Sequence, residues 1–163
     1  MTTDIIQPAG DPQVGNLATP LNSSGFSKVF IRNLPAYRKG LSAHRRGLEV
    51  GMAHGFFFYG PFAILGPLRD SDYAAAAGVL AAVGLVTILT VALSIYSSAV
   101  VGKPSETVTT PDVPEELGTS EGWSEFAGGF FLGGCGGAFF AYFICLTPHL
   151  ALLQSIAAGV WSS

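Results

Sequence analysis

Residues 47–70 read GLEVGMAHGFFFYGPFAILGPLRD. Its segment from residue 48 to residue 68 is apolar enough to cross a bilayer as a helix, for which about 20 residues are needed. Two ionisable residues, Glu49 and His54, nevertheless lie in its first half, where such a side chain is costly to desolvate. The stretch therefore predicts a membrane-spanning helix that carries a candidate functional site.

For each of these two residues, a structural role is an alternative to a role in binding a ligand. His54 is either a metal ligand or a neutral imidazole that is hydrogen-bonded to a neighbouring helix. Glu49 lies near the end of the span, so its carboxylate can bind a ligand, reach headgroup water, or pair with Arg45 or Arg46. The residues by themselves leave these alternatives open.

The composition of the whole chain favours a membrane protein. Of its 163 residues, 49% are hydrophobic and only 12% are charged, and the mean hydropathy is +0.46. A soluble domain carries about 25% charged residues, so the charged fraction here is about half of the usual value. The net charge of −3 gives no indication of a nucleic-acid partner.

Two further apolar runs follow the first, at residues 74–101 and 123–146. Each is long enough to span, which predicts an all-α integral membrane protein with three transmembrane helices. The chain is then a single membrane domain with these parts in order: an inner-surface arm at 1–46, transmembrane helices at 48–68, 74–101 and 123–146, an inner loop at 102–122, and an outer-side tail at 147–163.

The basic residues predict the orientation of these helices. Six of the eight lie before the first span; they are Lys28, Arg32, Arg38, Lys39, Arg45 and Arg46. Under the positive-inside rule the N-terminus stays on the cytoplasmic or stromal side, and an odd number of spans places the C-terminus on the opposite side. The arm is expected to be extended polypeptide on the inner surface, with a short turn of helix after Pro35.

Small residues recur every four positions in the two later spans. They are Ala74, Gly78 and Ala82 in the second span, and Gly129, Gly133, Gly137 and Ala141 in the third. A glycine costs about 1 kcal/mol relative to alanine in a helix in water, so something must pack into the second of these stripes. The usual compensation is another helix, and a flat macrocycle laid on the glycines is the alternative. Ser71 or Asp72 is the expected N-cap of the second span.

The tail begins with Pro148 and His149 and continues as an apolar run to Trp161. At about 13 residues this run is too short to span a bilayer. It is therefore expected to be buried against protein, to lie in the membrane interface, or to pack against its counterpart in a second copy.

The placement of the histidines limits the possible functions. His54 lies about 9 Å into the first span from its inner end, whereas His149 lies beyond the outer end of the third, so the two cannot hold one haem. The sequence shows no nucleophile beside a base, as an enzyme would need. It also shows no internal repeat, which would be expected of a transporter. Imidazole or carboxylate can instead supply the single axial ligand that chlorophyll magnesium needs. Glu49 and His54 are about 140° apart around a helix and about 7.5 Å apart along it, so they would serve two different rings.

A resemblance to a known family rests on four runs of sequence. They are NLPAYRKGLS at 33–42, RGLEVGMAHGFFFYGPF at 46–62, LGPLRDSD at 65–72 and WSEFAGGFFLGGCGGAFFAY at 123–142. With these runs the chain resembles photosystem I reaction-centre subunit XI, the L subunit, from about Thr19 to Tyr142.

The resemblance implies a peripheral, non-enzymatic, three-helix subunit of the thylakoid membrane with a lumenal C-terminus. It also implies that Glu49 and His54 bind antenna chlorophylls, that carotenoids pack nearby, and that Asp70 with the carbonyl of Pro67 belongs to a calcium site near a subunit contact. The implied partners are core reaction-centre proteins, neighbouring small membrane subunits, membrane lipid, and copies of the chain itself in a trimer. The alternative is a membrane anchor or small transporter-like subunit without pigment, whose histidine is only hydrogen-bonded.

Overall fold

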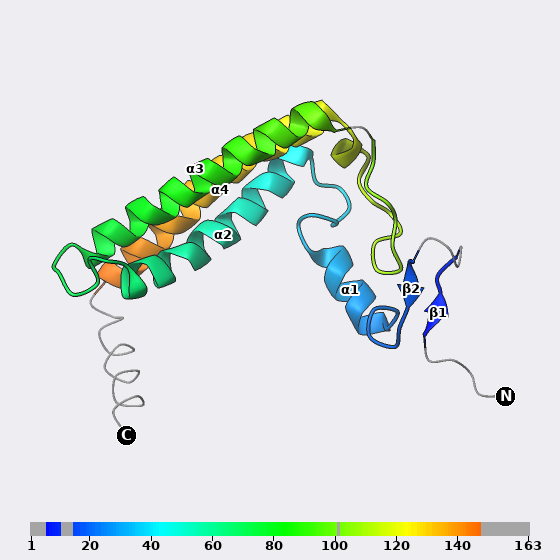
Figure 1. The fold of residues 1–163 in the computed structure, drawn as a ribbon, viewed down its shortest axis with the longest axis horizontal. Helices are drawn as coiled ribbons and strands as arrows, with labels where there is room; N and C mark the ends of the chain where they lie inside the picture. Colours follow the sequence, from blue (N-terminus) through cyan, green and yellow to red (C-terminus); the bar gives the residue numbers. More distant parts are fainter. Residues whose placement is uncertain (1–5, 11–14, 101, 148–163) are drawn as a thin grey trace, which may run out of the picture.

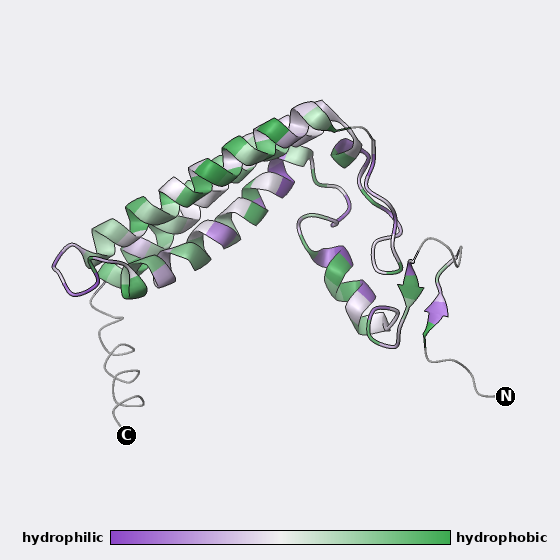
Figure 2. Cartoon of the chain, in the orientation of Figure 1, coloured by the Kyte–Doolittle hydropathy of each residue, from purple (hydrophilic) through white to green (hydrophobic). Residues whose placement is uncertain are grey.

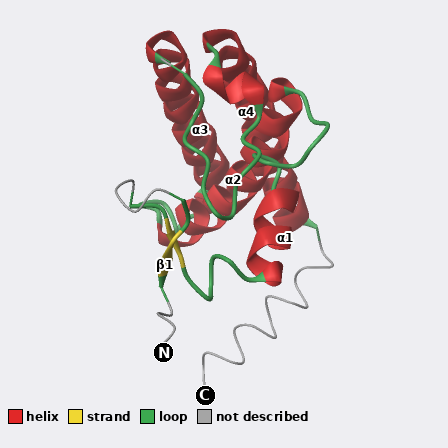
Figure 3. Ribbon diagram, turned by 90° about the vertical axis from the view of Figure 1, so that its right-hand side faces the viewer, coloured by secondary structure: helices red, strands yellow, loops and turns green. Residues whose placement is uncertain are grey.

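The computed structural model describes residues 6–10, 15–100 and 102–147. Its elements run in chain order as β1 (Gln7–Pro8), β2 (Leu17–Ala18), α1 (Gly25–Asn33), α2 (Ala43–Leu65), α3 (Ala74–Ala99), η1 (Glu115–Gly118) and α4 (Ser120–Leu146). Helices α2, α3 and α4 pack side by side in one bundle (Figure 1, Figure 3). The apolar tail from residue 148 onward, which includes His149, lies outside the described residues.

All three bundle helices are long and apolar enough to cross a membrane. Figure 2 shows hydrophobic residues along them, while much of the arm and of the loop between α3 and α4 is hydrophilic. The prediction of an all-α membrane protein with three transmembrane helices is thus confirmed. The arm and the α3–α4 loop lie at one end of the bundle, which we call the arm end; the connection at 66–73 forms the opposite, turn end (Figure 1).

Helix α1 lies before Pro35 and not after it. Its start is capped by Ser24, whose hydroxyl accepts a hydrogen bond from the amide of Ser27 at 3.1 Å. At its end the amide of Leu34 donates to the carbonyl of Ile31 at 3.1 Å. Because a proline disfavours helical geometry in the residue before it, Pro35 ends this helix. A single turn follows Pro35, as expected: the amides of Tyr37 and Arg38 donate to the carbonyl of Leu34 at 2.9 and 2.8 Å.

Helix α3 begins without a side-chain cap. Its N-cap residue is Tyr73, so the prediction of Ser71 or Asp72 is wrong. The Ser71 hydroxyl donates to the carbonyl of Leu68 at 2.7 Å and accepts from the amide of Tyr73 at 3.3 Å. Ser71 therefore stabilises the turn between α2 and α3 instead of the first turn of α3.

The most extensive helix contact joins α2 and α4 through two facing rows of glycine. A Cβ atom added to any of them would lie closer than 3.0 Å to backbone atoms of the opposite helix. Gly129, Gly133 and Gly137 of α4 face the carbonyls of His44, Leu48 and Met52, and Gly47, Gly51 and Gly55 of α2 face those of Phe126, Phe130 and Gly134. The stripe on α4 is thus filled by a helix, and the backbone of α2 leaves no room there for a macrocycle.

Helix α3 packs against this pair through small residues and one valine. Gly78 faces Ala63 of α2, and Ala82 is fully buried. Val86, also fully buried, lies against Gly134 of α4. The small residues at four-residue spacing therefore bring α3 close to its neighbours, as such residues do in membrane helix contacts.

The loop between α3 and α4 is tied to both the bundle and the arm. Val113 and Leu117 are buried, and the indole N–H of Trp123 donates to the carbonyl of Leu117 at 2.7 Å. Lys39 of the arm pairs with Asp112 at 3.0 Å, and the hydrogen bond and charge of Lys39 lower the pKa of the Asp112 carboxyl. Arm and loop therefore form one connected layer at the arm end.

Candidate functional site

His54 lies on an exposed part of α2 within the membrane-competent span. Its Nδ1 is 2.7 Å from the carbonyl oxygen of Val50, one turn earlier on the same helix. A carbonyl can only accept a hydrogen bond, so Nδ1 is the donor here, and in the neutral form of the ring this tautomer leaves the lone pair on Nε2. The hydrogen-bond partner is thus the histidine's own helix and not a neighbouring one. The described residues give Nε2 no hydrogen bond, so it is the ring nitrogen that stays available to bind a metal.

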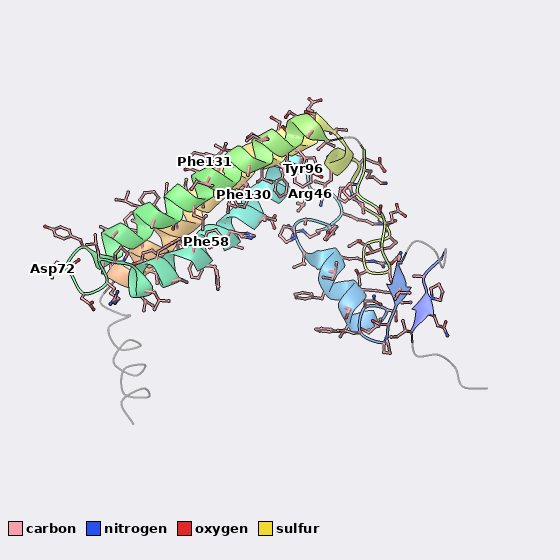
Figure 4. The ribbon with its side chains drawn as sticks, in the orientation of Figure 1. Arg46, Phe58, Asp72, Tyr96, Phe130 and Phe131 are labelled. Atoms are coloured by element: carbon pink, nitrogen blue, oxygen red, sulfur yellow. The ribbon has the colours of Figure 1, made fainter. Side chains whose placement is uncertain are left out.

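Aromatic and apolar side chains surround His54. The ring centroids of Phe58 and Phe130, both labelled in Figure 4, lie 5.7 and 5.6 Å from the imidazole centroid. Phe57, three residues further along α2, is 70% exposed. An apolar face that offers a single nitrogen fits a flat ring whose central metal lacks one axial ligand. Chlorophyll is such a ring, so these residues fit the cofactor that the sequence predicts.

Glu49, five residues before His54 on α2, pairs with the arm. Both of its carboxylate oxygens lie 2.5 Å from Nη2 of Arg38. The side chains of Arg38 and Glu49 remain 37% and 29% exposed, so the pair is open on one side. The arginine that pairs with Glu49 is therefore Arg38 and neither Arg45 nor Arg46.

Arg46 is only 3% exposed although it is charged. Its Nη1 donates to the carbonyl oxygens of Pro35, Ala36 and Arg38 at 3.1, 3.3 and 2.6 Å. Figure 4 labels Arg46 where α2 meets the arm. Sequence reasoning did not identify Arg38, and it named Arg46 only as a possible ion-pair partner of Glu49. No periodic pattern marks them, because their partners lie in the irregular turn between α1 and α2.

Asp70 and Pro67, the residues expected at a calcium site, lie in the connection at the turn end. The Asp70 side chain is 86% exposed, and its Oδ2 is 3.4 Å from Nε of Arg69. Within the described residues, no group of three or more His, Cys, Asp or Glu is arranged to hold a metal ion. Calcium takes about six to eight oxygen ligands, so Asp70 and the Pro67 carbonyl would supply only part of its shell.

An apolar groove of 620 Å³ lies between the bundle helices towards the turn end. Residues that line it include Phe56, Phe57, Tyr59, Pro61, Ile64 and Ala141. None of its lining residues is charged. The groove therefore suits an apolar chain better than a polar ligand.

Three relatives of this chain carry the same description as the family whose sequence model matches it. The sequence model of the family described as photosystem I reaction centre subunit XI matches residues 4–150. The subunit XI of Crocosphaera subtropica is 67% identical, and the match covers 94% of this chain and 98% of that protein. The subunit XI of Synechococcus elongatus is 60% identical over 99% of both chains. That of a Nostoc species is 54% identical, covering 94% of this chain and 88% of its own.

Proposed function

Because this chain belongs to the family of photosystem I reaction centre subunit XI, we propose that it binds antenna chlorophyll and carotenoid and links copies of the complex into a trimer. As a photosystem I subunit it is a structural component and not an enzyme, and its partners are other photosystem I components. Its three membrane-competent helices fit the thylakoid membrane.

The orientation of the His54 imidazole is the observation that carries the pigment proposal. Its Nδ1 is bound to the Val50 carbonyl, so Nε2 is the proposed axial ligand of one chlorophyll. A carboxylate oxygen of Glu49 is the proposed ligand of another, since the two residues are about 140° apart around α2. The chlorophylls supply light absorption, and the part of these side chains is to hold each ring in place. Carotenoid is proposed for the uncharged groove at the turn end.

Replacing His54 by Leu should remove or spectrally shift a chlorophyll, because leucine has no atom that can bind magnesium. Glu49→Ala should act on a different pigment. Both effects can be measured as chlorophyll content and as low-temperature absorption difference spectra of purified photosystem I. Core photochemistry should persist in both variants, since neither residue belongs to a core subunit.

His44→Gln is the matched control, because it also removes a histidine of α2, ten residues earlier. Its spectrum should equal that of the native complex. Under the alternative, a membrane anchor without pigment, His54 only forms the hydrogen bond to Val50. His54→Leu should then leave the spectrum unchanged. A high-resolution map without a tetrapyrrole within bonding distance of His54 would likewise refute the ligand proposal.

Contact between copies is proposed at the turn end. Asp70 and the Pro67 carbonyl would contribute oxygens to a bound calcium ion, and the missing ligands would come from a neighbouring chain or water. The apolar tail that follows α4 is the proposed main contact between copies in the trimer, since closed cyclic symmetry buries the same patch in every copy.

The proposed orientation places the arm end on the cytoplasmic or stromal side and the turn end in the lumen. The six basic residues before the first span support it. The ion pair between Lys39 and Asp112 supports only that arm and loop lie on the same side. In a chain with Cys135→Ala and Cys145→Ala, a membrane-impermeant maleimide should label Ser105→Cys from the cytoplasmic side. It should label Ser71→Cys only after the lumen has been opened. The reverse pattern would overturn this orientation.

A further inference from the structure

We propose that Arg38 and Arg46 are positioning residues for the chlorophyll proposed at Glu49. Arg46 fixes the backbone of residues 35–38, and Arg38, carried by that backbone, holds the Glu49 carboxylate in a single orientation. This inference rests on the proposed function, because it concerns how one of the two proposed chlorophyll ligands is held.

The first step is the burial of Arg46. A guanidinium removed from water is costly unless it forms hydrogen bonds; Nη1 of Arg46 shares its two hydrogens among three carbonyl oxygens, and Nε has no hydrogen-bond partner among the described residues. The three carbonyls belong to Pro35, Ala36 and Arg38, in a turn where no regular helix or strand supplies other partners. The side chain of Arg46 therefore determines the path of this turn relative to the start of α2.

The second step is the link from the turn to the carboxylate. The carbonyl of Arg38 accepts the shortest of the three bonds from Arg46, at 2.6 Å, so the Arg38 backbone cannot move without breaking it. Its Nη2 meets both oxygens of Glu49. A partly exposed glutamate otherwise samples several rotamers, and a fixed guanidinium removes that freedom. Arg38 thus orients the Glu49 carboxylate, just as the Val50 carbonyl orients the His54 imidazole. In both cases a polar contact other than the one to the proposed metal holds the ligand in place.

Arg45 provides the matched comparison. It follows the same turn and lies next to Arg46 in sequence, but it is exposed. The described residues give its side chain neither an ion pair nor a hydrogen bond; only its backbone amide donates, to the Ser42 hydroxyl at 3.3 Å. Removing its charge therefore alters the local charge without touching the chain of contacts from Arg46 to Glu49.

The experiment compares the chlorophyll content and low-temperature absorption difference spectra of purified photosystem I. Arg38→Gln and Arg46→Gln should each lose most of the chlorophyll that Glu49→Ala loses, with the same difference spectrum. Arg38→Lys should restore part of it, because an ammonium still pairs with the carboxylate. Arg38→Gln combined with Glu49→Ala should lose no more than Glu49→Ala alone. Arg45→Gln should match the native complex.

Two readouts separate positioning from general support of the fold. In Arg38→Gln the subunit content of the complex and the absorption feature assigned by His54→Leu should stay at native levels; loss of both would overturn the positioning role. If Glu49→Ala changes the spectrum and Arg38→Gln does not, the positioning role is wrong while the ligand proposal stands. If Glu49→Ala itself changes nothing, both the Glu49 ligand and this inference are wrong.

Discussion

Adding one methyl group at Gly133 is expected to remove most of this subunit from purified photosystem I. The three atoms nearest to a Cβ on Gly133 belong to the backbone of α2, at Leu48 and Met52, and each would lie closer than 3.0 Å. Because no side chain can move aside, Gly133→Ala has to force α2 and α4 apart. Overpacking of this kind costs about 1–3 kcal/mol and occasionally more.

Gly136→Ala is the matched control, since it lies three residues further on the same helix and nothing lies within 4 Å of a Cβ there. Alanine is favoured over glycine in a helix by about 1 kcal/mol in water, so this variant should be as stable as the native subunit or slightly more stable. Subunit content and the temperature at which the subunit dissociates in detergent measure the difference. Equal dissociation temperatures for Gly133→Ala and Gly136→Ala would show that the glycine contact does not hold the bundle together.

The three spans could be predicted from sequence, because length and lack of charge are what a bilayer demands of a helix. Where each helix starts could not. Helix α4 begins at Ser120, where hydropathy indicates residue 123, because the Thr119 hydroxyl accepts a hydrogen bond from the amide of Gly122 at 3.0 Å. Such a cap depends on the placement of one side chain, which an average over a window of residues does not contain.

Half of the glycine contact was also predictable. The spacing of the glycines on α4 indicates a close neighbour, but it does not say which helix that is. Gly47, Gly51 and Gly55 of α2 have the same spacing. Because Glu49 and His54 lie between those glycines and indicate a ligand site, the packing role of the glycines is not evident from the sequence.

The candidate site also has one part that the sequence predicts and one part that it does not. His54 stands out as an ionisable residue in an apolar run, and its orientation needs only the carbonyl one turn earlier, which any helix supplies. The pairing of Glu49 with Arg38 instead joins residues 11 positions apart across an irregular turn. No periodicity fixes the path of that turn, so only the three-dimensional structure identifies the partner.

If the complex forms the proposed trimer, removing residues 148–163 is expected to convert it into monomers that still absorb light and still reduce their acceptors. The glycine row of α4 is already filled by α2 of the same chain, so it is not available to a second copy. The segment 148–163 contains no Lys, Arg, Asp or Glu, and its apolar run of about 13 residues is too short to span. It is therefore an apolar segment that requires a partner, and a neighbouring copy is the partner we propose.

Sedimentation of the detergent-solubilised complex measures this conversion directly. Asp70→Asn should weaken the trimer less than the truncation, because it removes one proposed ligand of a calcium ion and leaves the apolar contact intact. Asp72→Asn, two residues further on the same exposed turn, is its matched control and should sediment like the native trimer. If the truncated chain assembles and sediments as the intact oligomer, the tail must pack within a single copy, and the contact between copies must lie elsewhere on the molecule.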